Sequence, residues 1–298
     1  IVETGTALEV YKNPQHPYTK KLIAAAPGKG DMSAGVTPVE PLLSLRNVTK
    51  LFGSFKAIDG VYLELMPGET LAVVGESGSG KSVTMMSLIG LLPSPPAEVR
   101  NGQVLFDGQD LLSASDADLR AIRGARIGMI FQDPNTSLNP RIQIGRILEG
   151  PLKRNTNMPP EARMRRVKDT LLRVGLLPEH AYFYPQMLAT GQKQRVCLAR
   201  ALILQPSIIV ADEALNGLDM AMRSQIINLF LELQEEMGVS FIYVSQHIGI
   251  VKHITDQIMV MDKGEVVESG DTHEVLTNPS HQITQRLVES HFYKAPNH

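Results

Sequence analysis

The sequence predicts an α/β fold with a central sheet flanked by helices. Two observations lead to this prediction. Short apolar runs at 71–74, 207–211 and 239–245 each have the length of one buried strand. Uninterrupted apolar runs of this length are typical of parallel strands covered on both faces. The segment 257–270 has two apolar halves around Lys263-Gly264, which predicts a strand pair joined by a tight turn.

Length and composition limit the classes of protein to consider. The 298 residues allow one large domain, or one domain with an appendage. The formal net charge of −2 gives no reason to expect nucleic acid as a partner. Cys197 is the single cysteine, which excludes an internal disulfide and a cysteine-built metal site and fits a reducing compartment. No apolar run approaches the ~20 residues that a membrane-spanning helix needs.

The first residues of the chain are similar to a segment near its end. Residues 2–22 align without a gap to residues 267–287. We therefore expect residues 1–26 to be the C-terminal tail of a preceding domain or an appendage, residues 42–290 to form one complete domain of the same kind, and residues 291–298 to be its tail. Residues 27–41 are rich in Pro, Gly and small residues and read as a flexible linker. The identical pairs are Val2/Val267, Glu3/Glu268, Gly5/Gly270, Glu9/Glu274, Val10/Val275, Asn13/Asn278, Pro14/Pro279, His16/His281, Thr19/Thr284 and Leu22/Leu287.

A glycine-rich loop follows the first apolar run and precedes a predicted helix at 83–92. Glycines in such a loop let backbone N–H groups turn inward around phosphates at a helix N-terminus. Lys81 is expected to reach the β- and γ-phosphates, and the Ser82 hydroxyl to ligate Mg²⁺. The alternative, a glycine-rich turn without a ligand, is disfavoured by the strand before it and the helix after it. The predicted phosphate-binding residues of this P-loop α/β core are Gly75, Glu76, Ser77, Gly78, Ser79, Gly80, Lys81 and Ser82.

Two acidic residues end the second apolar run, at 207–214. Asp212 is expected to hold Mg²⁺ through water, and Glu213 to act as the base that polarises the attacking water. Paired acids at a strand end are more often capping or solvated residues than catalytic ones. The P-loop earlier in the chain makes the catalytic interpretation the stronger of the two.

Three further segments complete a pattern: MIFQDP at 129–134, LATGQKQRVCLARAL at 188–202 and LNGLD at 215–219. Together with the P-loop and the acidic strand, their order resembles that of the ATP-binding cassette (ABC) ATPases, across about residues 42–290. The resemblance implies that Gln132 contacts Mg²⁺ and water and reports to a membrane partner. It also implies that Phe52 stacks on the adenine of ATP, the alternative being a core aromatic residue. A second nucleotide surface, used in trans in a head-to-tail dimer with a second ABC ATPase domain, is implied for Ala189, Thr190, Gly191 and Gln192.

Two positions depart from the pattern of that family. The signature segment usually reads Leu-Ser-Gly-Gly-Gln, but Ala189 and Thr190 stand where the family has Ser and Gly. A histidine usually follows the strand after the aspartate loop, and Gln246 occupies that position, with His247 next to it. Adjacent side chains at a strand end point in opposite directions, so His247 cannot simply replace it. Gln246 is therefore the candidate catalytic residue at this position.

Two helices are predicted from apolar periodicity. Residues 164–174 place Met164, Val167, Leu171 and Val174 on one face. The basic residues Arg163, Arg166 and Arg173 lie elsewhere and are interpreted as a solvated face rather than a nucleic-acid surface. Residues 224–237 place an apolar face before the strand at 239–245. The resemblance to the ABC ATPases also implies an inserted helical subdomain, expected over about 133–195, and an antiparallel β-subdomain. The predicted core face of the second helix consists of Ile226, Leu229, Phe230 and Leu233.

Finer resemblance indicates the peptide-transport branch of the family. NPQHPYTKKLIAA, at 13–25, is similar to the C-terminal segment of oligopeptide and dipeptide transporter ATPases, and the sequence from about residue 170 onward looks like the ATPase of Sap-type antimicrobial-peptide transporters. Some members carry an iron–sulfur cluster in the tail, but no cysteine is present there, so no cluster is expected. His16 and His281 lack a second ligand nearby in sequence and are interpreted as structural.

These observations predict an ATP-hydrolysing subunit of a membrane peptide transporter. ATP and Mg²⁺ are its expected cofactors, and a second ABC ATPase domain and transmembrane permease subunits its expected partners. The expected location is peripheral, at the cytoplasmic face of the inner (plasma) membrane. Two alternatives remain: a weakly hydrolysing or non-hydrolysing regulatory subunit, which Ala189 and Gln246 favour, and a soluble tandem ABC protein acting on ribosomes or DNA. The sequence does not identify the transported solute or the direction of transport.

Overall fold

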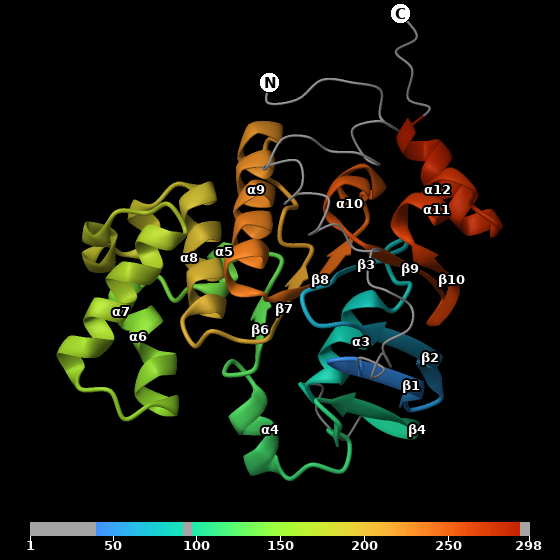
Figure 1. Cartoon of the computed structure of the whole chain (residues 1–298), viewed down its shortest axis with the longest axis horizontal. Coiled ribbons are helices and arrows are strands. Elements are labelled where there is room, and N and C mark those ends of the chain that lie inside the picture. Colours follow the sequence, from blue (N-terminus) through green and yellow to red (C-terminus); the bar gives the residue numbers. More distant parts are fainter. Residues whose placement is uncertain (1–39, 92–96, 293–298) are drawn as a thin grey trace, which may run out of the picture. The chain divides into compact units, whose positions relative to one another are not determined.

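The computed structural model describes residues 40–91 and 97–292, so the predicted opening tail and most of the predicted linker lie outside the described residues (Figure 1). The unit from Pro41 onward contains two sheets. One is antiparallel, with the strand order β2 (Phe55–Leu65), β1 (Leu43–Phe52), β4 (Ala97–Phe106) and β5 (Gln109–Asp110). The other has the order β10 (Glu265–Asp271), β9 (Gln257–Asp262), β3 (Thr70–Val74), β8 (Ser240–Ser245), β7 (Ile208–Asp212) and β6 (Ile127–Ile130).

The second sheet is parallel from β9 to β6, and only its edge strand β10 runs antiparallel. Strands β3, β7 and β8 are buried along their whole length, because both faces of the sheet are covered. Leu71 and Val73 of β3 face the cluster formed with the antiparallel sheet and α3 (Lys81–Leu88). Ala72 and Val74 face the cluster formed with α8 (Thr190–Leu202), α9 (Met220–Met237) and α10 (Ile248–Ile254), which Figure 1 shows on the opposite side. The predicted α/β class with an antiparallel β-subdomain is confirmed.

The remaining helices fall into two groups. One forms the inserted helical part, at the left of Figure 1, together with the start of α8. It contains α5 (Pro134–Ser137), α6 (Ile144–Asn155), α7 (Pro160–Arg173), and the short 3-10 helices η1 (Pro178–Tyr182) and η2 (Pro185–Met187). The other elements are α4 (Asp116–Ile122), which precedes β6, and α11 (Thr272–Thr277) and α12 (Gln282–Phe292), which follow β10. Because α8 continues to Leu202, the predicted limit at residue 195 falls inside a helix.

The helix after the P-loop differs from its prediction. It was expected over 83–92, whereas α3 begins at Lys81 and ends at Leu88. The start is earlier because Gly80, with a φ of 100°, is the N-cap, so the first helical turn includes Lys81 and Ser82. The end is earlier because the N–H of Leu91 bonds to the carbonyl of Met86, and Gly90 has a φ of 60°. The apolar residues that follow were mistaken for helix because periodicity alone does not mark such a stop.

The α9 helix agrees with its predicted face. Its buried residues are Ile226, Leu229, Phe230 and Leu233. The helix begins earlier than expected, at Met220, because the Asp219 side chain accepts a hydrogen bond from the N–H of Met222 and caps it. It ends at Met237, and the following Gly238 caps it in the left-handed conformation.

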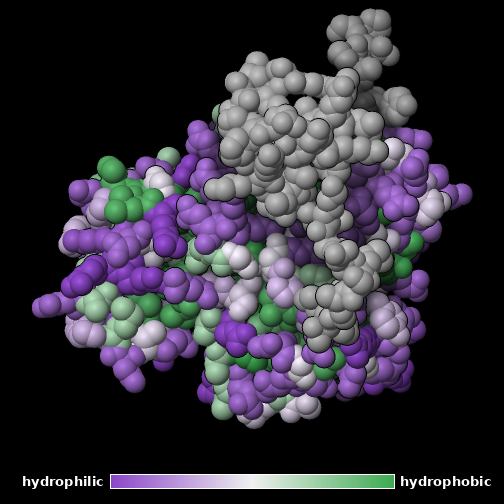
Figure 2. All heavy atoms as spheres, in the orientation of Figure 1, coloured by the Kyte–Doolittle hydropathy of each residue, from purple (hydrophilic) through white to green (hydrophobic). Residues whose placement is uncertain are grey.

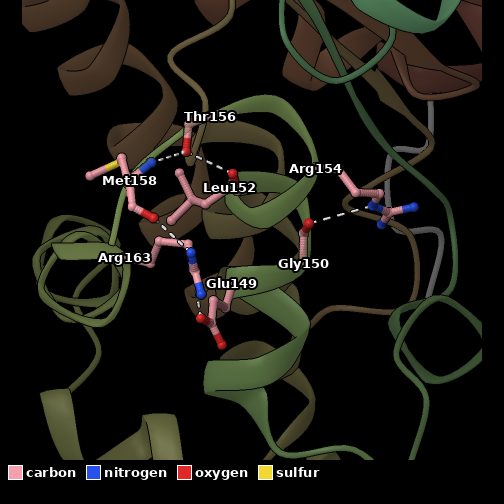
Figure 3. A network of polar contacts seen from close by, with 7 residues as sticks. All are labelled: Glu149, Gly150, Leu152, Arg154, Thr156, Met158 and Arg163. Carbon is pink, nitrogen blue, oxygen red and sulfur yellow. Dashed lines mark hydrogen bonds and ion pairs between the residues drawn. The ribbon is translucent and has the colours of Figure 1, made fainter. Parts of the chain in front are cut away.

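The α7 helix agrees with its predicted apolar face but not with the interpretation of its arginines. Val167, Leu171 and Val174 are buried. Figure 3 shows the guanidinium of Arg163 between the carboxylate of Glu149 on α6 and the carbonyl of Met158. It donates to Oε1 of Glu149 at 2.8 Å and to the Met158 carbonyl at 2.6 Å. The Arg163 side chain is 14% exposed, so this arginine joins two helices instead of facing solvent. The prediction was wrong here because a long side chain can lie along a helix pair while its head group finds a partner.

The strand pair predicted at 257–270 is present. Met261 pairs with Val266 and Asp262 with Glu265, so the turn lies at Lys263-Gly264. Both turn residues have positive φ, 47° and 88°, as a two-residue hairpin of the primed type requires. The turn contacts the P-loop, because the N–H of Gly264 donates to the carbonyl of Ser79 at 2.9 Å.

None of the helices in 40–91 and 97–292 has the length and apolar character that crossing a membrane requires. The face seen in Figure 2 is mainly hydrophilic, with separate hydrophobic patches.

Candidate functional site

A hollow of about 680 Å³ lies where β3 ends and α3 begins. The second sheet is parallel at this point, so the carboxyl ends of β3, β7 and β8 meet at one edge. Residues from the P-loop, the Gln132 loop, the ends of β7 and β8, and the two hairpin turns therefore face the same space. The lining consists of Phe55, Lys56, Ala57, Ser77, Gly78, Gly80, Lys81, Ser82, Val83, Gln132, Glu213, Gln246 and Lys263.

The P-loop is a tight turn pressed against its neighbours. A Cβ on Gly80 would lie 2.8 Å from the carbonyl of Ala57, so only glycine fits there. The Lys81 ammonium is buried and donates to the carbonyls of Gly75, at 2.9 Å, and Glu76, at 2.8 Å. Burial lowers the pKa of Lys81, while the nearby Glu213 and Asp212 carboxylates oppose that shift. The ammonium is thus fixed inside the loop that the sequence assigns to phosphates.

Ser82 and Asp212 bring together a hydroxyl and a carboxylate, and oxygen groups of these types are the ones that Mg²⁺ prefers. The Ser82 hydroxyl donates to Oδ1 of Asp212 at 3.1 Å. Burial raises the pKa of Asp212, and the hydrogen bond from Ser82 opposes the shift. Among the described residues, no group of three or more His, Cys, Asp or Glu could hold a metal ion alone. A magnesium ion at this pair would therefore complete its coordination with water and phosphate oxygens.

Glu213 is held by two amides. Nε2 of Gln246 donates to Oε1 at 2.6 Å, and Nδ2 of Asn216 donates to Oε2 at 2.9 Å. Glu213 is 9% exposed and has a φ of 48°, in the left-handed region that non-glycine residues rarely adopt. Strained backbone of this kind is frequent at functional sites.

Of the remaining residues predicted for this site, some line the hollow and others do not. Gln132 lines the hollow and is exposed at its edge. Phe52 is not among the lining residues, whereas Phe55, 68% exposed, is one of them. His247 is also absent from the lining and stands at the N-cap of α10.

The signature residues belong to a different surface. Ala189 is the N-cap of α8, and its N–H donates to Oε1 of Gln192 at 3.0 Å. A Cβ on Gly191 would lie 2.6 Å from Sδ of Met222, so α8 begins in close contact with α9. A smaller hollow of about 140 Å³ is lined by Ala189, Gly191, Gln192, Arg195, Met222, Gln225 and Ile226. None of the signature residues lines the P-loop hollow.

Sequence reasoning missed Asn216, which contacts Glu213, and several lining residues, among them Phe55 and Lys263. Asn216 stands in the LNGLD segment three positions after Glu213, a spacing at which a tight turn brings side chains together. Lys263 was assigned to a turn only. Its place beside the P-loop depends on the long-range contact between Gly264 and Ser79, for which the local sequence carries no signal.

Comparison with known proteins shows the family. The family model described as "ABC transporter" matches residues 58–216, and the model described as "Oligopeptide/dipeptide transporter, C-terminal region" matches residues 2–40. The chain is 50% identical over 266 residues to the putrescine export system ATP-binding protein SapF of Escherichia coli K12, covering 86% of this chain and 96% of that protein. The same values hold for the peptide transport system ATP-binding protein SapF of Salmonella typhimurium. The chain therefore belongs to the ABC transporter family.

Other relatives and solved structures agree with this assignment. The glutathione import ATP-binding protein GsiA of Escherichia coli K12 is 39% identical over 323 aligned positions, covering 96% of this chain but about half, 51%, of that protein. A dimeric post-hydrolysis ATP-binding cassette bound to ADP and Pi matches with a TM-score of 0.68 and 31% identity, covering 77% of this chain and 98% of that one. The cassette cbiO1 from Clostridium perfringens matches with a TM-score of 0.70 and 28% identity, covering 85% and 96%. This chain is an ATP-binding subunit of the family, and its reaction is ATP hydrolysis.

Proposed function

We propose that the chain binds ATP with Mg²⁺ and hydrolyses it as the peripheral energy-supplying subunit of a membrane peptide transporter. The observation that carries this proposal is the convergence on one hollow of a buried ammonium, a hydroxyl–carboxylate pair and a second carboxylate held by amides. These are the groups that phosphoryl transfer from a nucleoside triphosphate requires.

The groups divide the work as follows. A water molecule attacks the γ-phosphorus, the bond to the β–γ bridging oxygen breaks, and ADP leaves. Glu213 accepts the proton of the attacking water. Lys81 stabilises the negative charge of the phosphates, and Gln132 orients water at the edge of the site. Ser82 and Asp212 would hold Mg²⁺, which when bound neutralises charge on the phosphate oxygens.

The signature residues supply the other half of a site in a second cassette. They lie at the N-terminus of α8, whose positive end attracts anions, and they are outside the P-loop hollow of their own chain. A head-to-tail pair would bring Thr190 and Gly191 of one cassette to the γ-phosphate bound by the other. Two of the similar structures are described as dimeric, which supports this arrangement.

The membrane partner is assigned to the groove beside the Gln132 loop. A hollow of about 520 Å³ lies between β6, α5, α6 and α8, and Phe131, Pro151 and Arg200 are among its lining residues. Phe131 is 38% exposed there, next to Gln132. A transmembrane subunit that docks here would contact both the inserted helical part and the loop that faces the nucleotide. A conformational change at the nucleotide site would therefore be transmitted to the transmembrane subunit.

Peptides are the proposed solute class because of the matches at residues 2–40 and to SapF. The relatives carry names for peptide, putrescine and glutathione transport, so these three solutes are the ones to compare. The complex isolated from membranes by pull-down of the tagged chain should be reconstituted into vesicles. We expect a cationic antimicrobial peptide to stimulate ATP hydrolysis more than putrescine or glutathione. If putrescine stimulated ATP hydrolysis as much as the peptide does, the peptide assignment would be contradicted. If the tagged chain were recovered with ribosomes instead of membranes, the transport role would be contradicted.

The catalytic assignment is tested with two variants. Glu213→Gln keeps the shape and the hydrogen-bonding capacity but removes the base, so hydrolysis should fall by roughly 10²- to 10⁴-fold while ATP binding persists. Lys81→Ala should weaken ATP binding itself, because it removes the charge that faces the phosphates. Normal turnover of Glu213→Gln would show that another group is the base.

A further inference from the structure

We propose that Asn216 is a positioning residue for the catalytic base, acting as a pair with Gln246 on the two oxygens of Glu213. The inference rests on the proposed function, since it takes Glu213 as the group that accepts the proton.

The geometry gives each carboxylate oxygen one donor of its own. Nδ2 of Asn216 lies 2.9 Å from Oε2, and Nε2 of Gln246 lies 2.6 Å from Oε1. An ionised carboxylate only accepts hydrogen bonds, which settles that both amides present their nitrogen to Glu213. One donor would leave the carboxylate free to rotate about its terminal bond. Two donors on different oxygens fix its plane.

The backbone repeats the same pair of connections. The N–H of Asn216 donates to the carbonyl of Glu213 at 3.0 Å, which closes the turn after β7. The N–H of Glu213 donates to the carbonyl of Val244 on β8, also at 3.0 Å, two residues before Gln246. Glu213 is therefore tied to its own loop through Asn216, and to β8 through Val244 and Gln246. This double attachment holds the residue at a φ of 48°, where a side chain is normally disfavoured.

The chemical type of the two donors matters for the reaction. Carboxamides are neutral and do not titrate in the physiological range, so neither takes the proton that Glu213 has to accept. Each oxygen also keeps a further lone pair for the attacking water. Asn216 and Gln246 therefore hold the base in place without competing with it, and losing one of them should cost rate and not nucleotide affinity.

The experiment measures a single turnover of ATP by the full chain, so that the observed rate reports the hydrolysis step and not a later step such as product release. We expect Asn216→Ala to lower the hydrolysis rate by about 10- to 100-fold, the effect of losing one hydrogen bond to a charged group. Asn216→Asp has nearly the same shape but no donor and should lower the rate at least as much. Asn216→Ser keeps a donor and should retain an intermediate rate. ATP affinity and melting temperature should change little in all three, and Asn228→Ala, an exposed asparagine on α9, is the matched control.

The Glu213→Gln background separates positioning from a structural role. If Asn216 acts through Glu213, Asn216→Ala should change the residual rate of Glu213→Gln less than about twofold. Equal losses in the two backgrounds, or wild-type rates for Asn216→Ala and Asn216→Asp, would overturn the inference. If Glu213→Gln itself turned over normally, the proposed function of Glu213 would fail first. The two failures are therefore distinguishable.

Discussion

Phe52 and Phe55 face each other across the β1–β2 hairpin, yet only Phe55 lines the nucleotide hollow. Directly opposed residues of an antiparallel pair share one face, so both rings lie on the same side of the hairpin. Phe55 begins β2, and the next two residues of that strand, Lys56 and Ala57, also line the hollow. Phe55 is therefore a second candidate, beside Phe52, for the residue that stacks on the adenine ring.

The two aromatic residues can be told apart by mutation. Phe55→Ala should weaken ATP binding by roughly 5- to 100-fold, since stacking of a base on an aromatic ring is worth about 1–3 kcal/mol. Phe52→Ala is the matched control and should change the affinity less than about threefold. Tripolyphosphate, which lacks the base, should bind both variants like the wild type. A larger loss with Phe52→Ala in a nucleotide titration would restore the assignment made from the sequence.

Removing the Arg163 side chain should destabilise the inserted helical part. Arg163 bridges Glu149 and the carbonyl of Met158 (Figure 3). The side chains of Arg163 and Glu149 are only 14% and 24% exposed. We expect Arg163→Ala to lower the free energy of unfolding by about 1–3 kcal/mol, because it leaves a partly buried carboxylate and a carbonyl without their donor.

Arg165→Ala on the same helix is the control, because this residue is exposed. It should change the free energy of unfolding by less than about 0.5 kcal/mol in urea denaturation. The double variant with Glu149→Ala should lose less than the sum of the two single losses. Full additivity would mean that the ion pair does not couple α6 to α7.

The free energy of unfolding should fall at acid pH as the Glu268 carboxylate becomes protonated. Partial burial raises the pKa of this carboxyl, but the surrounding hydrogen bonds, among them those from the Ser280 hydroxyl and the N–H groups of Ser280 and His281, outweigh it and set the pKa at about 2. A pKa depressed in the folded state stabilises the fold above the ordinary glutamate pKa of about 4.3 and loses that contribution as pH falls toward 2.

Glu268→Gln should therefore lower the free energy of unfolding at pH 7 by about 1–2 kcal/mol, allowing for solvent screening. The gap between wild type and variant should narrow steadily from about pH 4.5 downward. Chemical unfolding at several pH values measures it, with the exposed Glu289→Gln as the control. A gap that stays constant down to pH 3 would show that the carboxylate charge plays no part.

Features set by local sequence patterns could be predicted, whereas contacts between distant elements could not. The core face of α9 was predicted because helical periodicity is a local pattern, and the P-loop because its residues are consecutive. The contacts of Glu213 with Gln246 and of Arg163 with Glu149 form because β7 lies beside β8 and α6 beside α7, which no local pattern predicts. His281 stands between these cases. It was interpreted as structural, and its Nδ1 accepts a hydrogen bond from the N–H of Ile283 at 3.2 Å.

Two positions of the chain, Gln246 and Ala189, depart from the family pattern. Gln246 still donates to Glu213, but it is a neutral amide where the family has a histidine, so it cannot supply the positive charge of a protonated imidazole. Ala189 offers no side-chain hydroxyl at the N-terminus of α8. In a homodimer, each nucleotide would meet both differences, Gln246 from its own chain and Ala189 from the other. A lost charge-assisted hydrogen bond is worth about 1.5–3 kcal/mol, so each difference alone could slow a site tenfold to a hundredfold. The chain alone should therefore be a weak ATPase, and a partner with the usual serine and histidine should accelerate it.

Two substitutions test this in the homodimer. Ala189→Ser combined with Gln246→His should raise turnover above either single change. Ala189→Ser also places a good N-cap residue three positions before Gln192, so it should raise the stability of α8 by about 1 kcal/mol even if turnover is unaffected. Thermal unfolding therefore has to be measured beside turnover, so that a gain in active protein is not mistaken for a gain in rate. If the unmodified chain alone already turns over at the ~1–10³ s⁻¹ typical of enzymes, and neither substitution alters that rate, the two departures are neutral and the expectation of a weakened site is wrong.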